Sequence, residues 1–131
     1  MPPNLVELLK SLGLRSSSDL FAQSVGRLGH SFEAVRQLQA HPTRFIDVSF
    51  ARGDEVRSWL SALVAGEPPS VLVVWLADRT AAEMPFPVLL ERYDDLWYPS
   101  MDDVAVIFPD GGLLLMDHEE RFCFGRVVTA A

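Results

Sequence analysis

Residues 104–128 have the sequence VAVIFPDGGLLLMDHEERFCFGRVV, in which three apolar runs are separated by two short polar segments. Short apolar runs joined by turn residues are typical of strands in an antiparallel meander. An Asp-Gly pair between apolar runs is a strong signal for a β-hairpin. We therefore predict strands at 104–108, 113–116 and 122–128, joined by turns at 109–112 and 117–120.

The geometry of the first turn makes this prediction specific. A two-residue turn at 110–111 would set Asp103 opposite His118 and Asp102 opposite Glu119. Acidic side chains before the first strand and in the second turn would then gather at one end of the sheet. A bulge at Gly112 would shift this register by one residue.

Upstream of the meander, residues 44–77 predict a strand, a helix and a second strand. Apolar and polar residues alternate from Arg44 to Phe50, which is typical of a strand with one wetter face. The helix has an apolar stripe at helical spacing and ends at Gly66. The run 71–77 is apolar on both faces, as in a central buried strand. This order predicts a right-handed βαβ unit with two parallel strands.

The N-terminal third, residues 1–43, is predicted to be helical. Its first helix ends before Gly13, and a second helical region follows the serine run 16–18. A further segment reaches Ala40, and the pattern leaves open whether residues 18–41 form one broken helix or two. A last helix is predicted to start at Pro85. Together these elements predict one α+β domain, 1–131, in which helices cover a mixed five-stranded sheet in two layers.

The composition indicates a globular protein of the cytoplasm. Of the residues, 49% are hydrophobic and 22% are charged, which is ordinary for a folded domain. Cys123 is the one cysteine, so no internal disulfide can form, as suits a reducing compartment. The N-terminus has no signal-peptide pattern, and the longest apolar run, 71–77, is too short to cross a membrane.

The net charge of −7 comes entirely from the last third of the chain. Residues 1–82 contain eight acidic and eight basic residues, whereas residues 83–131 contain ten acidic residues and three arginines. The negative electrostatic field of such an acidic region repels nucleic acid and anionic membranes and attracts basic partners. The alternative is an acidic surface that serves only solubility.

Aromatic residues beside these acids favour a contact surface for a protein. Residues 93–99 mix three aromatic side chains with two carboxylates, and tyrosine and tryptophan are enriched in binding hot spots. Alternatively, Trp97 and Tyr98 close the core over the sheet. The predicted partner-binding residues are Asp94, Asp95, Trp97, Tyr98, Asp102, Asp103, Asp117, His118, Glu119 and Glu120.

No catalytic residue, metal site or cofactor is predicted. A pair formed by His118 and Asp103 could act as an acid–base couple, but the sequence shows no nucleophile to accompany it. The sequence contains no nucleophile elbow, phosphate-binding loop or dinucleotide fingerprint. Cys123 lies within an apolar strand and has the character of an inert core residue. The sequence therefore favours a non-enzymatic protein and leaves a small enzyme as the alternative.

Three functional hypotheses follow. The first is a binding module that engages a basic protein, such as a nuclease-type toxin that it neutralises as an immunity-type protein. The second is a small enzyme or divalent-metal-dependent module that uses Asp102, Asp103, Asp117 and His118. The third is a structural or regulatory subunit of an oligomer, for which a homodimer is one form.

Overall fold

The computed structural model of the chain describes residues 3–29, 32–97 and 103–126, and these form an α+β fold. The helices are α1 (Pro3–Ser11), α2 (Ser18–Leu28), α3 (Glu33–Ala40), α4 (Gly53–Ser61) and α5 (Phe86–Leu96). The strands are β1 (Arg44–Asp47), β2 (Ser70–Trp75), β3 (Thr80–Pro85), β4 (Val104–Ile107), β5 (Leu113–Met116) and β6 (Arg121–Gly125).

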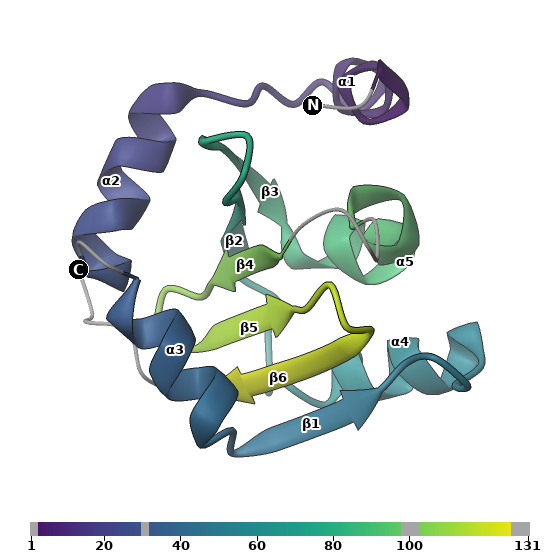
Figure 1. Ribbon diagram of the computed structural model, residues 1–131. Coiled ribbons are helices and arrows are strands. Elements are labelled where there is room, and N and C mark those ends of the chain that lie inside the picture. The colour runs from purple at the N-terminus through teal and green to yellow at the C-terminus, as the bar shows by residue number, and fades with distance from the viewer. Residues whose placement is uncertain (1–2, 30–31, 98–102, 127–131) are drawn as a thin grey trace.

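The six strands form one antiparallel sheet in the order β1-β6-β5-β4-β2-β3 (Figure 1). The expectation of a mixed five-stranded sheet is therefore wrong in both strand number and pairing. The additional strand is β3, whose sequence TAAEMP is poor in strand-favouring residues and which pairs with β2 as a hairpin. β1 and β2 point in the same direction, but β6, β5 and β4 separate them, so they form no paired βαβ unit.

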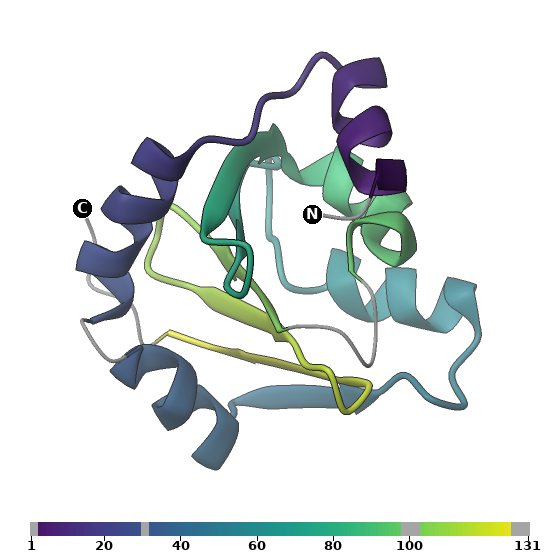
Figure 2. The same ribbon diagram turned by 45° about the horizontal axis from the view of Figure 1, so that its top comes forward.

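Helices cover both faces of the sheet, so the expected two-layer arrangement is also wrong. Figure 2 shows α2 and α3 on one side of the sheet and α1, α4 and α5 on the other. The alternation along β2 explains this, because Val73 packs in one apolar cluster and Val74 in the other, and both are fully buried. A strand that is apolar on both faces needs a cover on each side.

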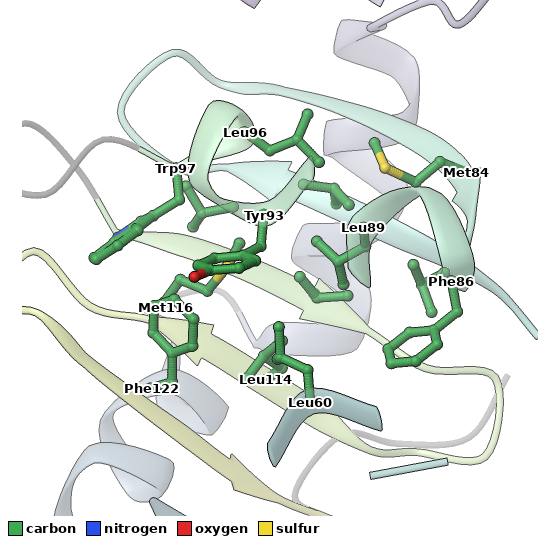
Figure 3. Close-up of a cluster of buried hydrophobic side chains, with 14 of the residues drawn as sticks. Leu60, Met84, Phe86, Leu89, Tyr93, Leu96, Trp97, Leu114, Met116 and Phe122 are labelled. Carbon is green, nitrogen blue, oxygen red and sulfur yellow. The ribbon is translucent and has the colours of Figure 1, made fainter. Parts of the chain in front are cut away.

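The larger apolar cluster lies between the sheet and the helices α1, α4 and α5 (Figure 3). Phe122 is fully buried at its centre. Its ring makes edge-to-face contacts with Tyr93, at 5.9 Å between ring centroids, and with Trp97, at 4.8 Å. Edge-to-face aromatic pairs add stability beyond the area that they bury. This cluster anchors the C-terminal end of α5 on the sheet.

Two separate helices, α2 and α3, occupy the region that the sequence left undecided. Ser17 begins α2 because its side chain accepts hydrogen bonds from the N–H groups of Asp19 and Leu20. Gly29 ends α2 with a φ of 91°, a conformation that favours glycine. The break at Gly29 allows α2 and α3 to cover different strands of the same sheet face.

The two hairpins of the meander have three-residue loops, which shifts the predicted register by one residue. Ile107 lies opposite Leu113, and the same register sets Asp103 opposite Asp117. In each loop the third residue has a positive φ, 93° at Gly111 and 62° at Glu120. A three-residue loop commonly closes with its last residue in this left-handed region. The prediction of Asp103 opposite His118 was therefore wrong by one position.

Candidate functional site

Several acidic residues of the last third come together at one end of the sheet, among them Asp103, Asp117 and Glu120. Strand register places five residues in one row across it: Ile46, Phe122, Met116, Val104 and Trp75. The turns after β1, β2 and β5 leave the sheet beyond this row (Figure 1), and Asp103 directly precedes Val104 of the row. The indole N–H of Trp75 donates to the carbonyl of Leu96 at 2.9 Å, so α5 also ends here. We call this region the acidic end, made up of Asp47, Asp94, Asp95, Asp103, Asp117, Glu119 and Glu120.

His118 is the centre of the charge network at the acidic end. Its Nδ1 lies 2.7 Å from Oδ1 of Asp103 and 3.3 Å from Oδ1 of Asp117. The backbone N–H of His118 also donates to Oδ1 of Asp103, at 2.8 Å. The predicted association of His118 with Asp103 is therefore present, although Asp117 is the direct cross-strand partner of Asp103.

The hydrogen bond and the negative charge of Asp103 raise the pKa of His118 above its ordinary value of 6.5. Asp117 and Glu119 add to this effect. Because the folded-state pKa is the higher one, the pair stabilises the folded protein fully below pH 6.5. This contribution is lost as the pH rises through the folded-state pKa.

Asp117 is buried and serves to fix the β5–β6 turn. Its Oδ1 accepts the N–H of Glu119 at 2.7 Å, and its Oδ2 accepts the side-chain amide of Gln39 at 3.3 Å. Arg121 in turn donates to the carbonyl of Gln39 at 3.3 Å. A buried carboxylate needs such partners, because desolvation without them is costly. The turn that carries His118 and Glu119 is consequently held in one geometry against α3.

The predicted partner-binding residues differ in their solvent exposure. Asp94, Asp95 and Glu119 are exposed, whereas Asp103 and Glu120 are half-buried. Trp97 is only 6% exposed and packs on Phe122, so the alternative in which it closes the core is the one observed. Its indole N–H has no hydrogen-bond partner among the described residues. Tyr98 and Asp102 lie outside the described residues.

Two exposed aromatic side chains were missed by sequence reasoning. Phe50 is 96% exposed and Phe45 is 62% exposed. Phe50 was assigned to a strand by alternation, but β1 ends at Asp47, whose Oδ1 accepts the N–H of Ser49 at 2.9 Å. The Asp-x-Ser pattern is the signal that could have placed a turn there, since aspartate side chains commonly bond the backbone two residues on.

Cys123 has the inert character that its sequence context predicted. It is fully buried in the apolar cluster beneath α2 and α3, opposite Leu115. Burial raises the pKa of its thiol above the ordinary value, so the reactive thiolate is disfavoured. A nucleophilic role at the acidic end is not supported for this residue.

Comparison with known proteins adds no family to this description. No protein-family model matches the chain, and neither a curated protein nor a solved structure matches it significantly. Among the helices of the described residues, none has both the length and the apolar character needed to cross a membrane.

Proposed function

We propose that this protein is a non-enzymatic binding module that engages a basic protein partner through the acidic end and Phe50. The observation that carries this proposal is the near-complete exposure of Phe50 beside the acidic β5–β6 turn. The N–H of Val48, two residues before Phe50, donates to the carbonyl of Glu120 at 2.9 Å. An exposed large aromatic residue among carboxylates combines an apolar anchor with charge selection.

The charge of the acidic end supports a basic partner. Its exposed carboxylates come from α5, from the last residue of β1 and from the turn after β5, so their fields add over one surface. Arg92 lies 3.6 Å from Asp95 in an exposed ion pair and offsets one of these charges. The remaining field would speed association with a basic protein and disfavour a second copy of this chain.

The edge strand β1 extends this surface. Its free side is at the edge of the sheet, and all of its residues except Ile46 are exposed. The other edge, β3, is covered by backbone bonding between Ser17 and Ala81, at 2.8 Å and 3.2 Å. An open edge strand can accept an extended segment of a partner. Phe45 on β1 and Phe50 beyond it would then contact the same partner.

A nuclease-type toxin is one partner class that fits this surface. Proteins that bind nucleic acid present basic surfaces to the phosphate backbone. An acidic protein that covers such a surface would block access to the substrate, which is the action of a toxin-neutralising, immunity-type protein. Neutralising a nuclease-type toxin is the most specific role that we propose for this surface.

Affinity capture from the native lysate tests the proposal. We expect a basic protein to be retained by wild type at low salt and released at high salt. The Phe50→Ala variant should bind this protein about tenfold more weakly, since a central aromatic contributes at least 1–2 kcal/mol at many interfaces. Asp94→Asn, Glu119→Gln and Glu120→Gln, combined in one variant, should mainly slow its association.

The matched control removes three acidic charges elsewhere, through Asp19→Asn, Glu33→Gln and Glu83→Gln. All three residues are exposed and lie outside the acidic end. This control should capture the partner as wild type does. Equal binding by wild type, Phe50→Ala and the variant of the acidic end would contradict the proposal, as would a captured protein without a basic surface.

The second candidate function is a divalent-metal-dependent module. It is favoured by the convergence of one ligand atom each from Asp103, Asp117 and His118, all within 4.8 Å of one another. An imidazole nitrogen with carboxylate oxygens suits Zn²⁺ or Mn²⁺. Two of the ligands would be pre-positioned, because Asp117 is held by Gln39 and His118 by Asp103.

Thermal unfolding with added Zn²⁺ distinguishes this second candidate. If the three residues bind the ion, wild type gains about 2.7 kcal/mol of stability at 100 times Kd. His118→Ala should lose this gain, whereas His41→Ala, which changes an exposed histidine elsewhere, should keep it. An equal response of wild type and His118→Ala would exclude the metal site.

A further inference from the structure

A cavity of about 630 Å³ lies at the end of the sheet opposite the acidic end. It is bordered by the start of β1, the end of β6, the β4–β5 turn and the segment that connects α4 to β2. These segments are far apart in the chain and meet only through the sheet order. A volume of this size is in the range of small-molecule sites.

The inner wall of the cavity is apolar and rigid. Phe108 and Phe124, which are 3% and 8% exposed, contribute rings packed edge to face at 5.6 Å between centroids. Leu63 and Val64, on the segment that follows α4, line the same cavity. Aromatic and aliphatic walls of this kind favour a ligand with an apolar body.

Arg44 supplies an available positive charge at the rim. Its guanidinium donates to the carbonyl of Ala62 at 3.1 Å, and no described carboxylate lies within ion-pair distance of it. Arg126 differs, since its guanidinium lies 2.8 Å from Oδ2 of Asp110. The hydrogen bond from the N–H of Gly112, and to a lesser degree Arg126, keep the pKa of Asp110 below its ordinary value.

The acidic groups of the cavity leave the charge of Arg44 uncompensated. Asp110 is neutralised by its own ion pair with Arg126. Glu67 also lines the cavity and is exposed on the segment after α4, and it forms no ion pair with Arg44 among the described residues. A guanidinium with unused donors is suited to a carboxylate, which it can bind through two parallel hydrogen bonds.

We propose that this cavity binds a small carboxylate with an apolar body. The carboxylate would bind the guanidinium of Arg44, and the apolar body would lie against Phe108, Phe124 and Leu63. Because Arg44 is exposed, the ion pair selects the ligand while apolar contact supplies most of the affinity. The site is independent of the acidic end and of the proposed protein partner.

Titration of the full-length chain with 1-naphthoate, followed by protein NMR, tests this site. The control ligand is 1-naphthalenemethanol, which has the same apolar rings but a neutral hydroxyl group in place of the carboxylate. We expect naphthoate to bind about threefold more tightly than the alcohol, since an ion pair with an exposed arginine adds only modest affinity. The shifted signals should come from residues that line the cavity, Leu63, Phe108 and Phe124 among them.

Arg44→Gln should remove the preference for naphthoate and leave the weaker binding of the alcohol unchanged. Arg15→Gln, which removes an exposed arginine from the segment between α1 and α2, is the matched control and should behave as wild type. Circular dichroism checks that both variants fold. Absence of naphthoate binding, equal affinity for the two compounds, signals shifted elsewhere, or an unchanged preference in Arg44→Gln would each overturn the site.

Discussion

The Phe122→Ala variant is expected to lose about 3–5 kcal/mol of unfolding free energy, the usual cost of removing a buried phenylalanine ring. Phe122 has no exposed surface and packs edge to face with Tyr93 and Trp97 (Figure 3). Its removal therefore leaves a cavity where α5 meets the sheet. Small domains have a total stability of about 5–15 kcal/mol, so this is a large fraction of it.

Urea unfolding followed by circular dichroism measures this effect. Phe50→Ala is the matched control, because the same side chain is removed from a position that is 96% exposed. We expect this control to change the unfolding free energy by less than about 0.5 kcal/mol. If Phe122→Ala does not fold, Phe122→Leu should fold with an intermediate stability. A loss below about 1 kcal/mol in Phe122→Ala would contradict the packing of α5 on the sheet.

The second large effect is expected on the other face of the sheet. Leu38 on α3 is fully buried in the cluster that also contains Cys123 and Leu115. Leu38→Ala should cost about 2–5 kcal/mol, the range found for buried leucines. This prediction depends on the cover of both sheet faces by helices, which the sequence alone did not indicate.

The control for this prediction is Gln37→Ala, because Gln37 is exposed on the same helix. Alanine has a higher helix propensity than glutamine, so this variant should be as stable as wild type or slightly more so. Both variants are compared by urea unfolding. If Leu38→Ala matched Gln37→Ala in stability, α3 would not be packed on the sheet as described.

Phe122 and Leu38 belong to different apolar clusters on opposite faces of the sheet. Losses at sites that share no contacts usually add. The acidic end depends on both clusters, since Trp97 packs on Phe122 and Asp117 bonds to Gln39 on α3. The packing of both apolar clusters therefore positions the carboxylates that are proposed to bind a partner.

Local sequence patterns correctly predicted the hairpin strands β4, β5 and β6, the helical character of the N-terminal third and the contact between Asp103 and His118. These features depend on residues close together in the chain. Alternating or continuous apolar runs define strands, and turn residues between them define hairpins. The charge asymmetry that concentrates acids in the last third is likewise a property of the sequence alone.

The hairpin register was decided by loop conformation. Three-residue loops that end at Gly111 and Glu120 replace the expected two-residue turn, and Asp117 rather than His118 becomes the partner of Asp103. An apolar run that is buried on both faces gives no periodic signal for its register. Every residue of β4 and β5 is buried, so the sequence alone did not distinguish the observed pairing of these strands from a pairing shifted by one residue.

Sheet order and side-chain exposure were decided by tertiary structure. β3 has weak strand propensity and exists because β2 offers it a partner, while β1 pairs with β6 instead of β2. The same packing buries Trp97 on Phe122, which the sequence left undecided. It leaves Phe50 exposed, although the alternation had placed Phe50 on the apolar face of a strand. Residue type and local period determine which segments become strands and helices. The choice of neighbours depends on contacts between segments distant in the chain, which no local pattern contains.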